Sequence, residues 1–283
     1  MKTITAPQVQ AMKQLEQKIA MVTAYDYPTA VLASRSGADI ILVGDSLGMV
    51  VLGYEDTLKV TMADMIHHCK AVARGTKGPL KVGDMPFMSY QVSTEQAVEN
   101  AGRFIQEGNM DAVKLEGAGY ADRVRAIIES GIPVMGHLGL TPQSVKAFGG
   151  FKIQGKTLNA ARKLLDDAVK LENAGVFSIV LEGIPAELAK MVTDAVHVPT
   201  IGIGAGAGCT GQVLVFHDLL AIPDPAPFQF VHTFEKAGSV MEKGLIDYVA
   251  AVRNGTFPEA GHSSHLSEPV EKALGKEVVR KCM

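Results

Sequence analysis

The sequence predicts a single (β/α)8 barrel, and three observations lead to this prediction. Eight short apolar stretches alternate with amphipathic segments along the 283 residues, several of the stretches are continuously apolar, and no linker divides the chain. Continuous apolar runs are typical of strands that are buried on both faces, as in a parallel sheet. Strands that alternate with helices without a break predict a closed parallel barrel, with a doubly wound sheet as the alternative.

The predicted strands share an apolar run that ends in glycine, proline or polar residues. They cover 19–26, 40–43, 80–87, 112–117, 133–139, 178–183, 199–204 and 211–217. The link between the last two strands is short and rich in glycine. It has no room for a crossover helix, which is the one irregularity of the pattern.

The predicted helices begin at capping residues or proline and end near glycine or a polar residue. They cover 6–17, 28–36, 61–74, 93–108, 122–130, 157–174, a stretch that starts at 185, and C-terminal helices within 227–254. The segment 140–156 is long and glycine-rich, as lids and binding loops are. We therefore expect a barrel domain over 1–258, with an N-terminal helix and a C-terminal helical extension. A weakly patterned tail over 259–283 is typical of a mobile chain end.

Composition predicts a soluble protein of the cytoplasm. Hydrophobic residues make up 47% of the chain, and the net charge of −3 comes without a basic cluster, which argues against nucleic acid and anionic membranes as partners. No apolar run approaches the roughly 18 residues of a membrane span, and the N-terminus lacks the apolar core of a signal peptide. Three widely spaced cysteines, Cys69, Cys209 and Cys282, favour a reducing compartment.

Carboxylates follow the apolar runs of four predicted strands, and three of them, Asp45, Asp84 and Glu116, come from neighbouring strands. In a barrel the carboxyl ends of all strands meet at one rim, where active sites lie. Three ionised carboxylates share a small volume only when a cation compensates them. Oxygen ligands favour a hard ion, and Mg²⁺ fits because it keeps open positions for water or substrate. The alternative is that each acid caps a helix or pairs with a distant arginine.

Three further side chains are expected at the same rim. Lys114 lies two residues before Glu116 and thus points to the same face of its strand, where it would meet a substrate carboxylate or an enolate, or form a structural ion pair. His137 is a hydrogen-bond donor, an acid–base group or a satisfied core histidine. Glu182 is a general base, a fourth metal ligand or a helix cap.

The motif Gly202-Ile-Gly-Ala-Gly-Ala-Gly208 resembles a dinucleotide-binding loop only in its glycines. A predicted strand, not a helix, follows it, and it contains no lysine or arginine. Close approach of the backbone at the barrel rim is the better interpretation.

Six motifs, in order along the chain from about Met12 to Pro258, resemble the ketopantoate hydroxymethyltransferase family. They are Gly44-Asp-Ser-Leu-Gly-Met-Val-Val-Leu-Gly53, Asp84-Met-Pro-Phe-Met-Ser-Tyr90, Val113-Lys-Leu-Glu-Gly117, Gly136-His-Leu-Gly-Leu-Thr-Pro-Gln143, Gly149-Gly-Phe-Lys-Ile-Gln-Gly-Lys156 and Gly202-Ile-Gly-Ala-Gly206. The resemblance implies a (β/α)8 barrel assembled into a homo-oligomer, typically a decamer. It also implies hydroxymethyl transfer from 5,10-methylenetetrahydrofolate to 3-methyl-2-oxobutanoate, which gives 2-dehydropantoate for pantothenate and coenzyme A synthesis through a Mg²⁺-stabilised enolate.

The same resemblance assigns roles to the rim residues. The metal site would comprise Asp45, Asp84 and Glu116, and the keto acid would contact Asp45, Ser46, Asp84 and Lys114. Glu182 would be the proton acceptor, and His137 an active-site residue that is the other candidate for the base. The sequence departs from the family at Thr210, where an aspartate is expected, and in a longer tail after Pro258. The alternatives are another Mg²⁺-enolate barrel enzyme of the phosphoenolpyruvate mutase/isocitrate lyase type and a non-catalytic ligand-binding barrel.

Overall fold

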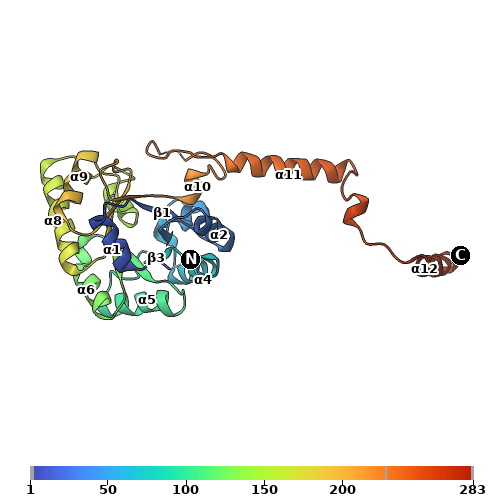
Figure 1. Cartoon of the computed structure of the whole chain (residues 1–283), viewed down its shortest axis with the longest axis horizontal. Helices are drawn as coiled ribbons and strands as arrows, with labels where there is room; N and C mark the ends of the chain where they lie inside the picture. The colour runs from blue at the N-terminus through green and yellow to red at the C-terminus, as the bar shows by residue number, and fades with distance from the viewer. Residues whose placement is uncertain (1–2, 227, 282–283) are drawn as a thin grey trace.

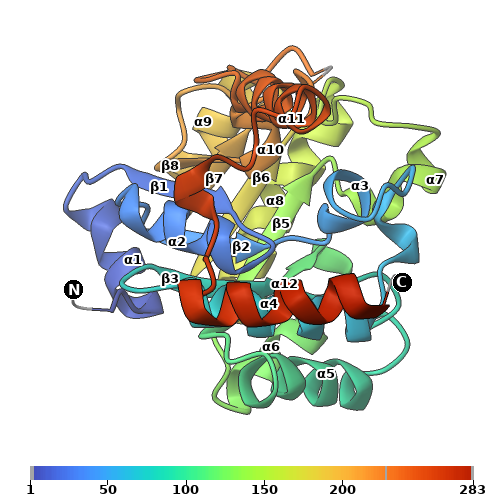
Figure 2. The same ribbon diagram turned by 90° about the vertical axis from the view of Figure 1, so that its right-hand side faces the viewer.

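The predicted barrel is confirmed: eight parallel strands close on themselves in chain order. The computed structural model describes residues 3–226 and 228–281. The strands are β1 (Ile19–Thr23), β2 (Ile40–Val43), β3 (Leu80–Asp84), β4 (Ala112–Glu116), β5 (Val134–Gly139), β6 (Ser178–Glu182), β7 (Thr200–Ile203) and β8 (Gly211–Leu214). Figure 2 shows the strands inside a surrounding layer of helices.

Amphipathic helices cover the outside of the barrel between the strands. The described helices are α1 (Ala6–Gln14), α2 (Tyr27–Arg35), α3 (Leu47–Val50), α4 (Met62–Gly75), α5 (Thr94–Gln106), α6 (Ala121–Glu129), α7 (Val145–Phe148), α8 (Leu158–Ala174), α9 (Ala186–Ala195), α10 (Phe216–Leu219), α11 (Ala237–Arg253) and α12 (Glu268–Lys281). Short 3-10 turns lie at η1 (Thr57–Lys59), η2 (Ala118–Tyr120), η3 (Pro142–Ser144) and η4 (Ala260–His262).

Helix α1 closes the N-terminal end of the barrel. Its buried residues Ala6 and Val9 join the apolar cluster inside the barrel, together with Ile19 and Leu80 from the starts of two strands. The ammonium of Lys13 in the same helix donates hydrogen bonds to three carbonyls at and after the end of α9, at 2.6 to 3.1 Å. With this end closed, the carboxyl ends of the strands form the open mouth, where barrel active sites lie.

The last two strands confirm the predicted short link. β7 and β8 pair in parallel with no helix between them. The hydroxyls of Thr200 and Thr210 each accept a hydrogen bond from the other residue's backbone N–H, at 3.3 Å, which ties the ends of the link together. The predicted strand over 211–217 is too long, because α10 starts at Phe216 directly after β8.

The C-terminal extension differs from the prediction in two ways. The stretch 227–254 holds one long helix, α11, that starts only at Ala237; Pro227 lies outside the described residues. The weakly patterned tail after Pro258, for which no helix was predicted, contains α12. Figure 1 shows α11 and α12 reaching away from the barrel, so both helices lack the barrel packing that usually stabilises a helix. Within the described ranges, every helix is too short or too polar to cross a membrane.

Candidate active site

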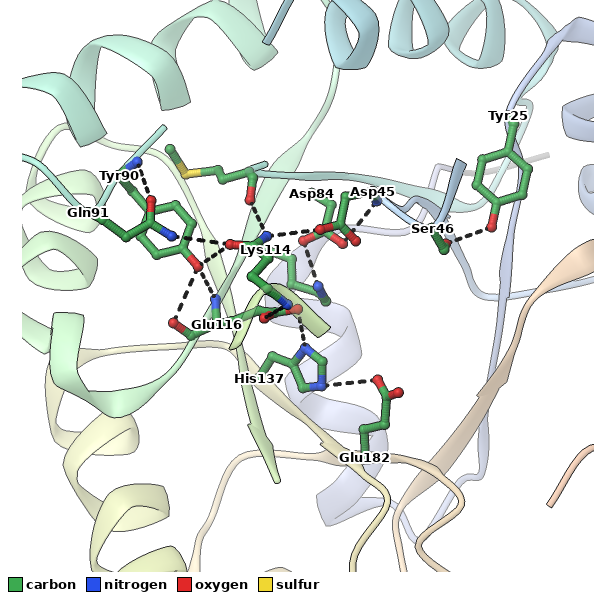
Figure 3. Close-up of polar contacts among 12 residues, drawn as sticks. Tyr25, Asp45, Ser46, Asp84, Tyr90, Gln91, Lys114, Glu116, His137 and Glu182 are labelled. Carbon is green, nitrogen blue, oxygen red and sulfur yellow. Dashed lines mark hydrogen bonds and ion pairs between the residues drawn. The ribbon is translucent and has the colours of Figure 1, made fainter. Parts of the chain in front are cut away.

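Strand register places the predicted rim residues next to one another. In the parallel ladder Asp84 is opposite Lys114, and Glu116 is opposite His137. Asp45 follows β2 after a single glycine. All five side chains are at most 4% exposed, so the barrel mouth holds a compact charged cluster that bulk water barely reaches. Figure 3 shows these side chains converging from four neighbouring strand ends.

A buried ion pair joins β3 to β4. The ammonium Nζ of Lys114 lies 2.5 Å from Oδ1 of Asp84, and the backbone N–H of Asp45 donates to Oδ2 of the same carboxylate at 3.3 Å. Burial acts to lower the pKa of Lys114, but the carboxylates of Asp84, Glu116 and Asp45 outweigh it and raise that pKa above its ordinary value. Lys114 is therefore a permanent cation. The structural ion pair considered from the sequence is present.

The pKa values of Asp45 and Asp84 are both raised. For Asp45 the causes are burial first, then repulsion from the carboxylates of Asp84 and Glu116. For Asp84 burial again raises the pKa, and Lys114 opposes it. Carboxylates that are buried together in this way gain from a nearby divalent cation, which would favour their ionised form. The donor set thus fits a hard oxygen-binding ion.

Glu116 is oriented differently from the two aspartates. Its Oε2 accepts a hydrogen bond from the backbone N–H of Gln143 at 3.1 Å, and its Oε1 lies 3.3 Å from Nδ1 of His137. Among the described residues, no three acidic, histidine or cysteine side chains are arranged around a common metal position. Mg²⁺ is usually held by one or two carboxylates alongside water and substrate oxygens, a number that Asp45 and Asp84 would match. The three-carboxylate set stays a prediction.

His137 bridges the two sides of the mouth. Its Nδ1 faces Glu116, and its Nε2 lies 3.3 Å from Oε2 of Glu182 on β6. Neither contact has hydrogen-bond geometry, so both are ion-pair contacts. Burial and the charge of Lys114 lower the pKa of His137, but its two carboxylate neighbours outweigh them and raise it to about 9. The imidazole is therefore cationic at neutral pH.

Glu182 is the most open of the predicted acids, with 18% of its side chain exposed. It does not cap the following helix, since α9 has no side-chain cap. Ser46, also predicted at the site, exchanges a hydrogen bond of 2.8 Å with the hydroxyl of Tyr25 (Figure 3). Ser46 and Glu182 both line a cavity of about 1090 Å³ that opens from the barrel mouth.

Sequence reasoning missed Gln143, which connects three parts of the cluster. Its side-chain N–H₂ donates to Oδ2 of Asp45 at 3.0 Å and to the carbonyl of Met85 at 2.9 Å. Its side-chain oxygen accepts from the hydroxyl of Tyr90 at 2.7 Å and from Gln91 at 3.2 Å. Gln143 lies in the short 3-10 turn η3, where no strand or helix periodicity marks it. Its one sequence signal is its place at the end of a motif that begins next to His137.

Comparison with known proteins gives one consistent family. A family model described as ketopantoate hydroxymethyltransferase matches residues 3–260. The 3-methyl-2-oxobutanoate hydroxymethyltransferase of Clostridium novyi (strain NT) is 55% identical over 267 residues, which is 94% of this chain and 97% of that protein. The protein of the same name from Syntrophobacter fumaroxidans (strain DSM 10017 / MPOB) is also 55% identical, over 96% of both chains.

Solved structures with the same architecture are distant in sequence. Phosphonopyruvate hydrolase, in a complex with oxalate and Mg²⁺, matches with a TM-score of 0.60 at 11% identity and covers 98% of both chains. A 2,3-dimethylmalate lyase of the phosphoenolpyruvate mutase/isocitrate lyase superfamily matches with a TM-score of 0.59 at 13% identity, over all of this chain and 98% of that one. At this level of identity the likeness shows the shared barrel fold.

Replacing Gln143 by Leu should destabilise the protein, because it leaves several buried polar groups around it without a partner. We expect the free energy of unfolding to fall by about 3 kcal/mol, measured as a lower thermal midpoint. Gln106→Leu, on the exposed end of α5, is the matched control and should change stability by less than about 0.5 kcal/mol. Equal midpoints for the two variants would show that Gln143 does not hold the cluster together.

The protonated form of His137 should stabilise the fold in a pH-dependent way. Its pKa is raised to about 9 in the folded protein, so this stabilisation is complete below the unfolded value of about 6.5 and is lost as pH rises through 9. Thermal unfolding of the metal-free protein in EDTA should therefore show a larger loss of stability between pH 7 and 10 than the His137→Asn variant does. Parallel pH profiles of the two proteins would contradict this pKa.

Proposed function

The chain belongs to the ketopantoate hydroxymethyltransferase family, and on this basis we propose that it carries out the reaction for which its relatives are named. A hydroxymethyl group passes from 5,10-methylenetetrahydrofolate to 3-methyl-2-oxobutanoate. The keto acid loses the proton on C3, this carbon forms a bond to the carrier's methylene, and water supplies the product's hydroxyl oxygen. The two bonds from the methylene to the carrier's nitrogens break, and the C3 proton and one proton of the water balance those that the nitrogens take up. The products are 2-dehydropantoate and tetrahydrofolate, which places the reaction in pantothenate and coenzyme A synthesis.

The observation that carries this proposal is the separation of charge across the barrel mouth. Lys114 and the two aspartates lie on one side, on or directly after β2 to β4, and Glu182 lies on the other side, on β6. With a divalent cation on the two aspartates, a keto acid held between the two sides would present its oxygens to that cation and Lys114, and its C3–H to the carboxylate of Glu182. This is the arrangement that forming an enolate requires, because positive charge faces the developing oxyanion while a base faces the proton.

Asp45 and Asp84 would hold the divalent cation, which we propose to be Mg²⁺. Their raised pKa values and their place beside the only buried lysine ammonium of the cluster support this assignment. When bound, such an ion supplies Lewis-acid polarisation of the keto group. Glu116 would support the site through Gln143, whose amide also contacts Asp45.

The remaining side chains position the substrate and move its proton. Lys114 provides the fixed positive charge for the substrate's carboxylate or enolate oxygen. Ser46, oriented by Tyr25, would contact the keto acid at the edge of the cavity. His137, flanked by two carboxylates, holds a proton already and is buried, so it positions Glu182 instead of accepting the C3 proton. Glu182 is partly open to the cavity and is the base we propose.

Association into a homo-oligomer, with a decamer as the family resemblance implies, forms a further part of the proposal. Helix α11 supports it, since Val240, Leu245 and Ile246 are each at least 59% exposed on a helix that stands clear of the barrel. Apolar residues exposed together mark a protein contact.

A cytoplasmic site of action agrees with the buried free thiols of Cys69 and Cys209. Sedimentation as a monomer, or fractionation with membranes, would contradict these assignments.

Replacing Glu182 by Gln should abolish proton removal but keep the keto acid bound. Loss of a general base lowers turnover by about 10²–10⁴-fold. With Mg²⁺ in deuterated water, wild-type protein should exchange the C3 proton of 3-methyl-2-oxobutanoate, followed by NMR, and Glu182→Gln should not. Glu187→Gln, on the exposed first turn of α9, is the control. Exchange at the wild-type rate in Glu182→Gln would exclude Glu182 as the base.

The overall reaction is tested by product formation from both substrates. Product should require methylenetetrahydrofolate, disappear in EDTA and return with Mg²⁺. Turnover of the keto acid without folate would favour an enzyme of the phosphoenolpyruvate mutase type, and absence of turnover under all conditions a ligand-binding barrel.

A further inference from the structure

The cavity at the barrel mouth is far larger than the keto acid needs. Its volume of about 1090 Å³ lies at the upper end of the range for pockets that enclose drug-sized ligands. The small keto acid would occupy only the part near Ser46 and Glu182. The rest is mostly apolar, runs past β6, β7 and β8, and lies beneath the loop that joins α10 to α11.

Aromatic side chains from two distant segments meet along this outer part. Phe228 and Phe230, in the loop before α11, are stacked with ring centroids 5.4 Å apart and an interplanar angle of 17°. Phe151, in the segment 140–156, meets Phe228 edge-on at 6.5 Å. Phe230 lies so close to Gly204 that a Cβ there would be 3.0 Å from its ring. The glycine after β7 therefore lets the aromatic loop lie directly on the barrel rim.

Asp218 and Lys152 are two of the charged side chains that line the same cavity, besides Glu182 and Lys18. Asp218, in α10, is half-buried, and its side-chain carboxylate takes part in none of the hydrogen bonds or ion pairs found in the described ranges. Burial raises the pKa of its carboxyl to about 6. Lys152 is exposed at the outer end. The cavity thus offers a hydrogen-bond acceptor at Asp218, an aromatic wall that is 39% exposed at Phe230, and an exposed cation at Lys152.

We propose that this cavity is the binding site of the folate carrier, an inference that rests on the proposed function. The amino-pyrimidinone edge of the reduced pterin, which presents two parallel N–H donors, pairs with the carboxylate of Asp218. The aminobenzoyl ring contacts Phe228 and Phe230, and the glutamate carboxylates face Lys152. The carrier's methylene lies between its pterin and aminobenzoyl rings, so this orientation brings it alongside Ser46 and Glu182, where the keto acid is held.

Binding of tetrahydrofolate, measured by calorimetry with keto acid and Mg²⁺ present, tests this site without requiring turnover. Loss of an aromatic contact should weaken binding about three- to tenfold in Phe230→Ala, and loss of a charge-assisted pair about tenfold or more in Asp218→Asn. Phe234→Ala is the matched control, since Phe234 lies in the same loop, is 68% exposed and does not line the cavity.

A truncated probe distinguishes the two ends of the carrier. Asp218→Asn should weaken binding of 6-methyltetrahydropterin as well as of tetrahydrofolate. Lys152→Gln should weaken binding of tetrahydrofolate only, because only tetrahydrofolate has the anionic tail.

Unchanged affinities in Phe230→Ala and Asp218→Asn would overturn the proposal, as would a wild-type protein that does not bind tetrahydrofolate. Exchange of the keto acid's C3 proton, which needs no folate, shows in each variant that the site is folded. Its absence in the wild-type protein would count against the proposed function and not against the carrier site.

Discussion

The buried contact between Lys114 and Asp84 is the interaction on which the rest of the site depends. Without the ammonium, Asp84 would be an uncompensated buried carboxylate next to Asp45, and removing one partner of a buried pair typically costs about 3–5 kcal/mol. Parallel pairing of β3 with β4 puts the two residues opposite each other. A slip of one residue would turn Lys114 and Glu116 to the outer face of the barrel. The strand register that closes the barrel therefore also determines which side chains point into the candidate active site.

Strand register also places the charged side chains of β5 and β6. Glu116 lies opposite His137 on β5, and Gly139 of that strand lies opposite Glu182 on β6. Each of these strands thus places a charged side chain beside one from the neighbouring strand. The cluster therefore extends from Asp84 on β3 to Glu182 on β6. Helix α1 blocks the other end of the barrel. Substrates consequently enter where these side chains are, and the large cavity opens there.

The sequence predicted the barrel and the placement of its acids because both follow from local patterns. An apolar run that ends in a carboxylate can be recognised without knowing the fold, and the fold then brings such endings together. Gln143 and Tyr90 could not be found in this way, since each lies in an irregular segment and contacts the cluster only through tertiary structure. The tail helix α12 was not predicted because the sequence after Pro258 is only weakly patterned. The roles of the individual acids also stay predictions, since they depend on ligands and not on the fold.

The charges at the barrel mouth also explain why a divalent cation suits this site better than a third basic side chain. Asp45, Asp84, Glu116 and Glu182 face two cations, Lys114 and the protonated His137. With all of them ionised, the cluster keeps an excess of two negative charges, the charge that one divalent ion cancels. Another lysine would cancel half of it and would leave no open coordination position for a substrate oxygen. A divalent ion would cancel all of it and would have coordination positions left for the keto acid. The carboxylates of Asp84 and Glu116, which together with burial raise the pKa of Asp45, would also provide the affinity for such an ion.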